Sequence, residues 1–404
     1  MSAAVSRGRL ISAQTLKTSL DDDGHGHMTL IGRRADTARL GELLRDTRLV
    51  TVTGPGGVGK SALAAEAIGR LGRGRSAPEV LRVDMAPVRE AAAVHRRLAE
   101  AARRLPDSGR RAAVLLVDTC EHVAGAVVDG LEVLLRQRTG LRVVATSRVP
   151  LGGAAGAACA TGAGAAGAAA TGAGAGAGAV GGVARRHTWP RGATLRLEPL
   201  APADSVALLE SLAPHAMLDD DADREALRAT CALLEGLPLA ARIAASQLAR
   251  HCPDRLLERI SRPAGCLDLA VEGPRWPARQ RSLRASLRWT HRLLTPAEQL
   301  LWARCSVFPG TFRLPDAAEV CADERLPPDA LPAVFRALLR QGVLAVRHRG
   351  GGARAQAGAA ERPVRMARPV RAYGMDQLVR LGEEADFQRR CLDWTMVTED
   401  TWED

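Results

Sequence analysis

Residues 49–61 read LVTVTGPGGVGKS, and the fold follows from this stretch. Leu49 to Thr53 form an apolar, β-rich run of the kind that makes a buried strand. Gly54 to Ser61 then match the pattern G-x-x-x-x-G-K-[ST] with every spacing kept. The Ala- and Leu-rich segment from Ser61 to Leu71 favours a helix. A glycine-rich loop between such a strand and such a helix is the setting that separates a phosphate-binding loop from a chance glycine turn.

The chemistry of this loop predicts a bound nucleotide with Mg²⁺. Glycines let successive backbone N–H groups face a phosphate chain, and the helix N-terminus adds partial positive charge. Lys60 would reach the β- and γ-phosphates, and the Ser61 hydroxyl would bind Mg²⁺. Lysine occurs only here and at Lys17, although the chain has 56 Lys and Arg residues, so a compact ammonium is favoured at this position over arginine. The predicted nucleotide-binding residues of the loop are Gly54, Pro55, Gly56, Gly57, Val58, Gly59, Lys60 and Ser61.

Two further strands end in residues suited to the same chemistry. An apolar strand ends at Asp118, which is predicted to hold Mg²⁺ directly or through water. Glu121 is the nearest further carboxylate; either it orients the attacking water or it is a surface residue of the next helix. Arg148 follows another strand, at the ligand-binding edge of a parallel sheet, where it either senses the γ-phosphate or is an ordinary surface arginine. With Lys60, these three side chains make up the predicted catalytic set.

Length and composition exclude several classes of protein. The chain has 404 residues, of which 46% are hydrophobic, so wholesale disorder is excluded and two or three domains are expected. No apolar run reaches the roughly 18 residues that a membrane-spanning helix needs, and the N-terminus has no secretory apolar core. We therefore expect no membrane partner and a cytoplasmic location. The eight cysteines are scattered without a CxxC pair, which favours reduced thiols over a zinc or disulfide framework.

The pattern along the chain predicts an α/β P-loop NTPase domain with a parallel sheet, followed by a small helical domain and a winged-helix domain. A Gly- and Ala-rich stretch, residues 152–182, interrupts the first domain and is expected to be a flexible insertion. Thr295-Pro296-Ala297-Glu298 marks a helix start in the third domain as a capping box. The predicted boundaries are 1–28 for a disordered tail, 29–200 for the NTPase domain, 201–275 for the helical domain, 276–375 for the winged helix and 376–404 for a helical tail.

The order of motifs resembles that of STAND-type P-loop ATPases, relatives of the NB-ARC switch proteins, and in particular the ATPase modules of large bacterial transcription regulators. The resemblance covers roughly residues 29–375. It implies that a nucleotide is held between the three domains, and that the ATP and ADP states are two arrangements of them. The segments that carry it are LIGRRADTARLGELL, LVTVTGPGGVGKSALA, LLVDTCEH, VVATSRVPLG, LEPLAPADSVALL, LLEGLPLAARIAA and SLRASLRWTHRLLTPAEQLLWARCSVFPGTF.

The resemblance also assigns roles to single residues. Ile31, Gly32 and Arg33 match the family's segment that covers the nucleotide base on one side. Pro238 matches the proline of a Gly-Leu-Pro turn that packs on the adenine from the other side. Arg148 matches the family's sensor arginine. Ile31, Arg33 and Pro238 are therefore added to the predicted nucleotide-binding residues.

Three positions depart from the family. Thr119 stands directly after Asp118, where the family usually has a polar amide or an acid. Ala367 and Arg368 stand where NB-ARC relatives carry the His and Asp of a Met-His-Asp motif, whose His reads the β-phosphate. These departures bear on hydrolysis and on the sensing of the phosphates, and not on the loop itself.

Three functions remain open at this level. The expected one is an ATP/ADP-binding signal-transduction switch with slow ATP hydrolysis, which acts on an unidentified protein partner or signal and is compatible with an ATP-dependent homo-oligomer. The first alternative is a hydrolysis-dead scaffold that keeps its nucleotide as a structural ligand. The second is a DNA-binding regulator, which the net charge of +11 and seven arginines between residues 347 and 371 favour, although DNA is not the preferred partner.

Overall fold

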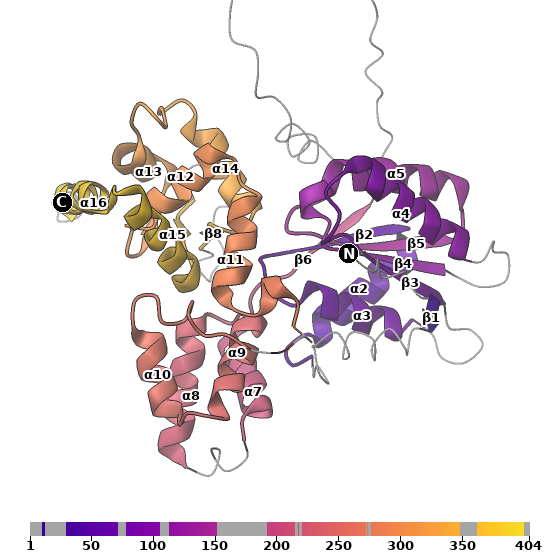
Figure 1. Ribbon diagram of the computed structural model, residues 1–404, viewed down its shortest axis with the longest axis horizontal. Coiled ribbons are helices and arrows are strands. Elements are labelled where there is room, and N and C mark those ends of the chain that lie inside the picture. Colours follow the sequence, from indigo (N-terminus) through magenta and orange to yellow (C-terminus); the bar gives the residue numbers. More distant parts are fainter. Residues whose placement is uncertain are drawn as a thin grey trace, which may run out of the picture. The chain divides into compact units, whose positions relative to one another are not determined.

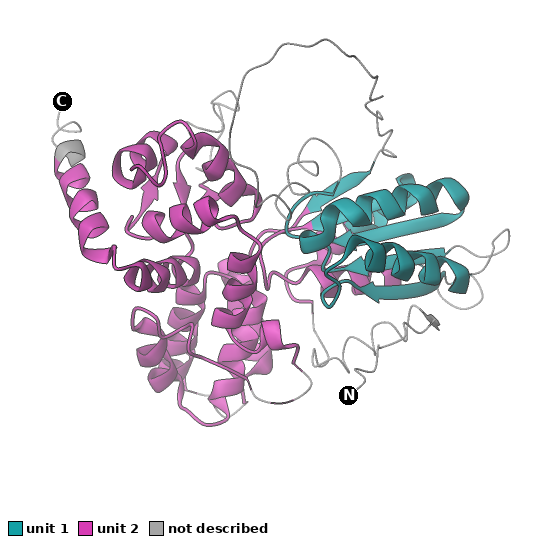
Figure 2. Cartoon of the chain, turned by 45° about the horizontal axis from the view of Figure 1, so that its top comes forward, with its two compact units in different colours: residues 1–13, 40–52, 70–195 teal, residues 14–39, 53–69, 196–404 magenta. Residues whose placement is uncertain are grey.

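A computed structural model describes residues 10–12, 30–71, 78–105, 113–151, 192–214, 217, 220–271, 273, 276–347 and 362–399. Figure 1 shows its helices and strands and labels most of them. The chain divides into two compact units, which alternate along the sequence (Figure 2). Unit 1 holds residues 1–13, 40–52 and 70–195, and unit 2 holds residues 14–39, 53–69 and 196–404. The predicted insertion, 152–182, lies outside the described residues, as does the predicted tail, 1–28, apart from residues 10–12.

Six strands form one sheet in the order β1-β3-β4-β5-β2-β6. Strands β2, β3, β4 and β5 pair in parallel, and β1 pairs with β3 in the antiparallel direction. Strand β5 therefore lies between β2 and β4, and the carboxyl ends of these three strands share one edge of the sheet. The strands are β1 (Leu10–Ser12), β2 (Leu49–Thr53), β3 (Glu79–Asp84), β4 (Ala113–Asp118), β5 (Leu141–Thr146) and β6 (Ala193–Arg196).

In unit 1, helices α4 (Ala91–Arg104) and α5 (Ala124–Gln137) cover one face of this sheet. Leu115 and Val117 of β4 pack with Leu98 of α4 in one buried apolar cluster. Because successive strand residues point to opposite faces, Asp118 belongs to the face that α4 and α5 leave uncovered. The apolar cluster thus orients the strand that carries the predicted catalytic acid.

Unit 2 is largely helical, and a three-stranded sheet in the order β7-β9-β8 completes its C-terminal part. One apolar core runs through the helical and winged-helix regions, from Leu209 to Cys391. The strands are β7 (Thr311–Phe312), β8 (Ala345–Val346) and β9 (Val364–Arg365). The helices that begin in unit 2 are α2 (Arg34–Asp46), α3 (Lys60–Gly69), α7 (Pro202–Leu212), α8 (Asp221–Leu234), α9 (Pro238–Leu248), α10 (Pro253–Ser261), α11 (Leu283–Arg292), α12 (Pro296–Cys305), α13 (Leu314–Cys321), α14 (Leu331–Arg340), α15 (Arg368–Leu381) and α16 (Glu384–Glu399).

Local sequence explains several of these helix starts. The predicted capping box begins α12: the Thr295 N–H donates to Glu298 Oε2 at 2.8 Å, and the Glu298 N–H donates to Thr295 Oγ1 at 3.3 Å. Proline stands in the first turn of α7, α9, α10 and α12, where its missing N–H costs no helical hydrogen bond. No helix in the described part of the chain combines the length and apolar composition that crossing a bilayer requires.

A buried arginine ties the end of the winged-helix region together. The side chain of Arg304 in α12 is 1% exposed and forms ion pairs with Asp323 and with Glu383, the second of these at 3.0 Å. It also donates to the carbonyl oxygen of Cys321 at 2.9 Å and stacks 4.4 Å from the ring centre of Phe387. The hydrogen bond from Arg304 lowers the pKa of Asp323 to about 2. Such a guanidinium is tolerated in an apolar core only because every side of it has a partner.

Candidate nucleotide-binding site

The glycine-rich loop follows β2, and its last two residues, Lys60 and Ser61, begin α3, so the motif lies between a strand and a helix as predicted. Gly57 has φ +81° and Gly59 has φ +99°, a region that residues with a side chain rarely adopt. The Lys60 ammonium donates to the carbonyl oxygens of Gly54 and Pro55, both at 2.8 Å. The loop therefore has the curled backbone of a phosphate cradle, and its lysine folds back across it.

The first turn of α9 sits directly on this loop. The backbone N–H of Leu239 donates to the carbonyl oxygen of Gly57 at 3.1 Å. A Cβ atom on Gly57 would lie only 2.7 Å from Leu239 Cβ, so the contact needs a glycine. Pro238, the predicted adenine contact, is the first residue of the same helix. Gly342, which follows α14, approaches Pro55 from the winged-helix side, since a Cβ built on Gly342 lies 3.5 Å from Pro55 Cβ.

The segment before α2 supports the loop from another direction. Arg33 is buried, and its Nη2 donates to the carbonyl oxygens of Val58 at 3.2 Å and Glu198 at 2.8 Å. Its Nη1 pairs with Asp36 at 3.0 Å. Ile31 packs against a small apolar cluster of α7 and α9. In the described arrangement the Arg33 guanidinium thus holds backbone carbonyls of the loop and of the segment after β6, a role that the sequence did not indicate.

In unit 1, Asp118 is held on both carboxylate oxygens. Its side chain is 1% exposed, Oδ2 accepts from Arg82 Nη2 at 2.8 Å, and Oδ1 accepts from the Thr146 hydroxyl. The same hydroxyl accepts from the backbone N–H of Thr119 at 3.0 Å. Thr119 has φ +61°, which is a strained value for a β-branched residue. Nothing in the sequence around Asp118 pointed to Arg82, because the two residues are 36 positions apart.

Glu121 and Arg148 are brought together and buried in unit 1. Arg148 Nε lies 3.3 Å from Glu121 Oε1, and the two residues are 8% and 6% exposed. The surface interpretations of both residues are therefore wrong, while their catalytic roles stay predictions. Cys120 lies between the acidic residues Asp118 and Glu121 in the sequence. Burial, and to a smaller extent the charges of Glu121 and Asp118, raise the pKa of its thiol well above the usual value.

The predicted metal ligands fit Mg²⁺ unequally. Ser61 is the second residue of α3, which is the position from which its hydroxyl is predicted to bind a phosphate-bound cation. Asp118 does not fit as a direct ligand in this arrangement, because a guanidinium already neutralises its carboxylate and both oxygens accept hydrogen bonds. Among the residues that the structure describes, no group of three or more His, Cys, Asp or Glu side chains could hold a metal ion by itself.

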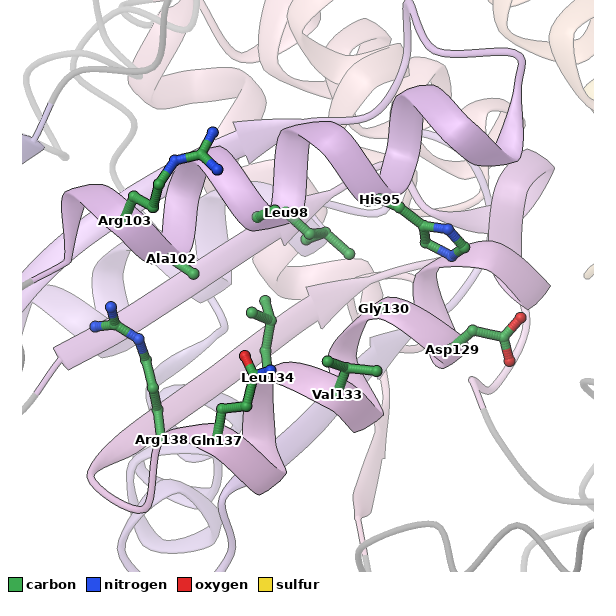
Figure 3. Close-up of a pocket in the computed structure, with 11 residues that line it drawn as sticks. His95, Leu98, Ala102, Arg103, Asp129, Gly130, Val133, Leu134, Gln137 and Arg138 are labelled. Carbon is green, nitrogen blue, oxygen red and sulfur yellow. The ribbon is translucent and has the colours of Figure 1, made fainter.

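A separate cavity of about 490 Å³ lies between α4 and α5 in unit 1 (Figure 3). Its lining includes His95, Leu98, Asp129, Val133 and Arg138. It shares no residue with the phosphate-binding loop or with the surroundings of Asp118. We therefore do not assign it to the nucleotide.

Comparisons with known proteins agree with this fold. No protein-family model matches the chain. A protein named "Putative HTH-type transcriptional regulator" from Mycobacterium bovis is 28% identical over 376 residues, which cover 87% of this chain and 36% of that protein. An uncharacterized protein of the same organism is 26% identical over 323 residues, covering 74% of this chain and 70% of the relative. The chain thus spans only 36% of the length of the first of these relatives.

Among solved structures, a Walker-type ATPase of Pyrococcus abyssi superposes with a TM-score of 0.51 at 12% identity, covering 86% of this chain and 96% of that one. At that identity the likeness concerns the fold. Together with the strand order and the glycine-rich loop after β2, it means that this chain has the fold of a P-loop ATPase, continued by a helical region and a winged helix.

Proposed function

We propose that this chain is a regulatory switch that binds ATP or ADP on the loop from Gly54 to Ser61. The observation that carries the proposal is the hydrogen bond from Leu239 to Gly57, at 3.1 Å. Through it, the first turn of α9 reads the position of the loop backbone, and Gly342 touches the same loop at Pro55. A ligand that reorganises the loop must therefore change contacts of both the helical and the winged-helix region.

Within this proposal the predicted residues divide by task. Lys60 would leave the carbonyls of Gly54 and Pro55 to bind the phosphates, which replaces two neutral acceptors by a charged one. Pro238 and Ile31 would flank the base. Arg33 would act by holding Val58 in place, and not by touching the base. Slow hydrolysis would fall to Asp118, Glu121 and Arg148.

The winged helix offers less support for direct DNA binding. Three of its predicted DNA-contacting arginines are engaged within the chain: Arg365 pairs with Glu235, Arg368 donates to the carbonyl oxygen of Ser261 at 2.7 Å, and Arg371 donates to that of Phe308 at 3.3 Å. A regulatory role, in keeping with the name of the longer mycobacterial relative, does not require this domain to touch DNA itself.

The test is nucleotide binding by purified protein. The protein would be prepared without added nucleotide and denatured, and any released nucleotide identified; binding of a fluorescent ADP analogue would then be titrated. We expect wild type and Lys60→Ala to differ at least tenfold in affinity. Lys17→Ala, which removes the chain's other lysine, is the matched control and should bind as wild type does. Absence of adenine-nucleotide binding by the wild type refutes the proposal.

Two further assays separate the alternatives. Multiple-turnover ATP hydrolysis that Lys60→Ala abolishes favours the switch over the hydrolysis-dead scaffold. Duplex DNA binding whose affinity falls steeply with salt, with a slope of about −0.9 per phosphate contact, would favour the DNA-binding regulator.

A further inference from the structure

An arginine in the middle of strand β3 calls for an explanation. Residues 79–84 read EVLRVD, and Arg82 interrupts an otherwise apolar run in a sheet that also buries its neighbouring strand completely. Its side chain is only 15% exposed. A charge with so little access to water is stable only beside an opposite charge.

The strand register supplies that charge. Arg82 is the pairing partner of Leu116 on β4, and Asp118 lies two residues further along the same strand and on the same face. The guanidinium reaches diagonally along the sheet to Asp118, with Nη2 to Oδ2 at 2.8 Å. Thr146 from β5 binds the other oxygen. Asp118 thus receives one cation and one hydroxyl, from the strands on either side of β4.

We propose that Arg82 is the built-in counter-cation of Asp118 and occupies the place that Mg²⁺ takes beside such an acid. Arginine keeps its proton at every accessible pH, so it cannot vacate the site by losing its charge. Mg²⁺ also gives up its water reluctantly and binds best where several oxygens are open to it, whereas both oxygens of Asp118 already accept hydrogen bonds, and the described residues hold no group of three or more candidate ligands here. Mg²⁺ would have to displace the guanidinium physically. The expected consequence, which rests on the proposed function, is nucleotide binding that hardly depends on Mg²⁺.

The exclusion of the metal can be tested without any nucleotide. The melting temperatures of wild type and Arg82→Leu would be measured with and without 10 mM MgCl₂. Removing the guanidinium uncovers a buried carboxylate, so we expect Arg82→Leu to melt lower and to gain a Mg²⁺ response. A site with a dissociation constant of about 1 mM would shift the folding equilibrium elevenfold at this concentration, and raise the melting temperature by about 3–5 °C. Wild type should shift by less than about 1 °C.

Two more variants make the result specific. Arg82→Leu combined with Asp118→Asn removes both charges and should lose the Mg²⁺ response. Arg136→Leu deletes an exposed arginine that pairs with the buried Glu132 on α5, away from Asp118, and should not acquire a Mg²⁺ response. If Arg82→Leu does not fold without the metal, Arg82→Gln replaces it with the same expectation. A Mg²⁺ response in the wild type equal to that of these variants, or no response in either Arg82 variant, overturns the proposal.

A second measurement addresses the nucleotide. The affinity for the fluorescent ADP analogue would be compared in excess Mg²⁺ and in EDTA. We expect a difference below threefold in wild type and of tenfold or more in the Arg82 variant that folds. A tenfold requirement for Mg²⁺ in the wild type contradicts the inference. If the wild type binds no nucleotide, the proposed function is refuted and this comparison does not apply. The melting experiment then tests by itself whether Arg82 excludes Mg²⁺ from Asp118.

Discussion

Gly57→Ala should uncouple α9 from the phosphate-binding loop. Two costs add at this position. An alanine at φ +81° costs about 1–2 kcal/mol of conformational energy. Its Cβ would also lie 2.7 Å from Leu239 Cβ, which belongs to the rigid base of the side chain and cannot rotate away. Helix α9 must then move, and the hydrogen bond from Leu239 to the Gly57 carbonyl, worth about 0.5–1.5 kcal/mol net, is lost. We expect a total loss of about 1.5–3.5 kcal/mol in the free energy of unfolding.

Gly59→Ala is the matched control. Gly59 has a similar positive φ of +99°, but a Cβ built on it meets no atom within 4 Å. Only the conformational cost of about 1–2 kcal/mol then applies. The difference between the two variants therefore isolates the contact with α9.

The assay is urea unfolding of nucleotide-free protein, followed by tryptophan fluorescence. Of the six tryptophans, Trp276, Trp289, Trp302 and Trp394 are described and belong to unit 2, which also contains the loop and α9, while Trp189 falls in unit 1; replacing Trp189 with Phe in every variant keeps the signal on unit 2. Equal losses in the two glycine variants would refute the reasoning, because the Leu239 contact would then contribute nothing to stability.

Three further outcomes are expected. Arg304→Met leaves Asp323 and Glu383 without their buried partner and should cost about 3–5 kcal/mol in the same urea assay; a loss below 1 kcal/mol would argue against the network. Because Arg304 lowers the pKa of Asp323 to about 2, this stabilisation is complete above about pH 4 and is lost as the pH falls toward 2. Melting curves between pH 2 and 5 should show that loss in wild type and a weaker one in Arg304→Met. Glu235→Gln keeps a hydrogen-bond acceptor but removes the charge that pairs with half-exposed Arg365. The free energy of unfolding should therefore fall by no more than about 1 kcal/mol, and a fall above about 3 kcal/mol would contradict the treatment of this ion pair as solvent-exposed.

Local signals predicted much of this fold. The strand Leu49–Thr53 and the capping box at Thr295 lie where they were predicted, because each depends on residues within a few positions of one another. The two-residue strand β7 was missed, since so short a segment has no periodicity to detect. Helix α10 was missed as well, although Pro253 at its start and the apolar spacing of Leu256 and Ile260 were available signals.

In the candidate site, too, local features were predicted from the sequence and long-range contacts were not. The loop around Lys60 was found because its motif is contiguous. The residues that contact Asp118 and Arg33 were not predicted, because those contacts depend on strand register and on segments that are distant along the chain. Arg82 meets Asp118 only through the pairing of β3 with β4, and Arg33 reaches a carbonyl 165 residues along the chain. The burial of Arg148 against Glu121 likewise depends on where two strands end, which a single sequence does not specify.

The alternation of the two units has a genetic consequence. The chain passes from one unit to the other after residues 13, 39, 52, 69 and 195, so the first four residues of β2 and the loop that follows the strand are assigned to different units. A stop codon or a recombination point therefore cannot remove one unit and leave the other whole. Any fragment that keeps both the loop and α9 must also carry residues 70–195 of unit 1. The module packs as two bodies, yet it can be inherited, shuffled or deleted only as one.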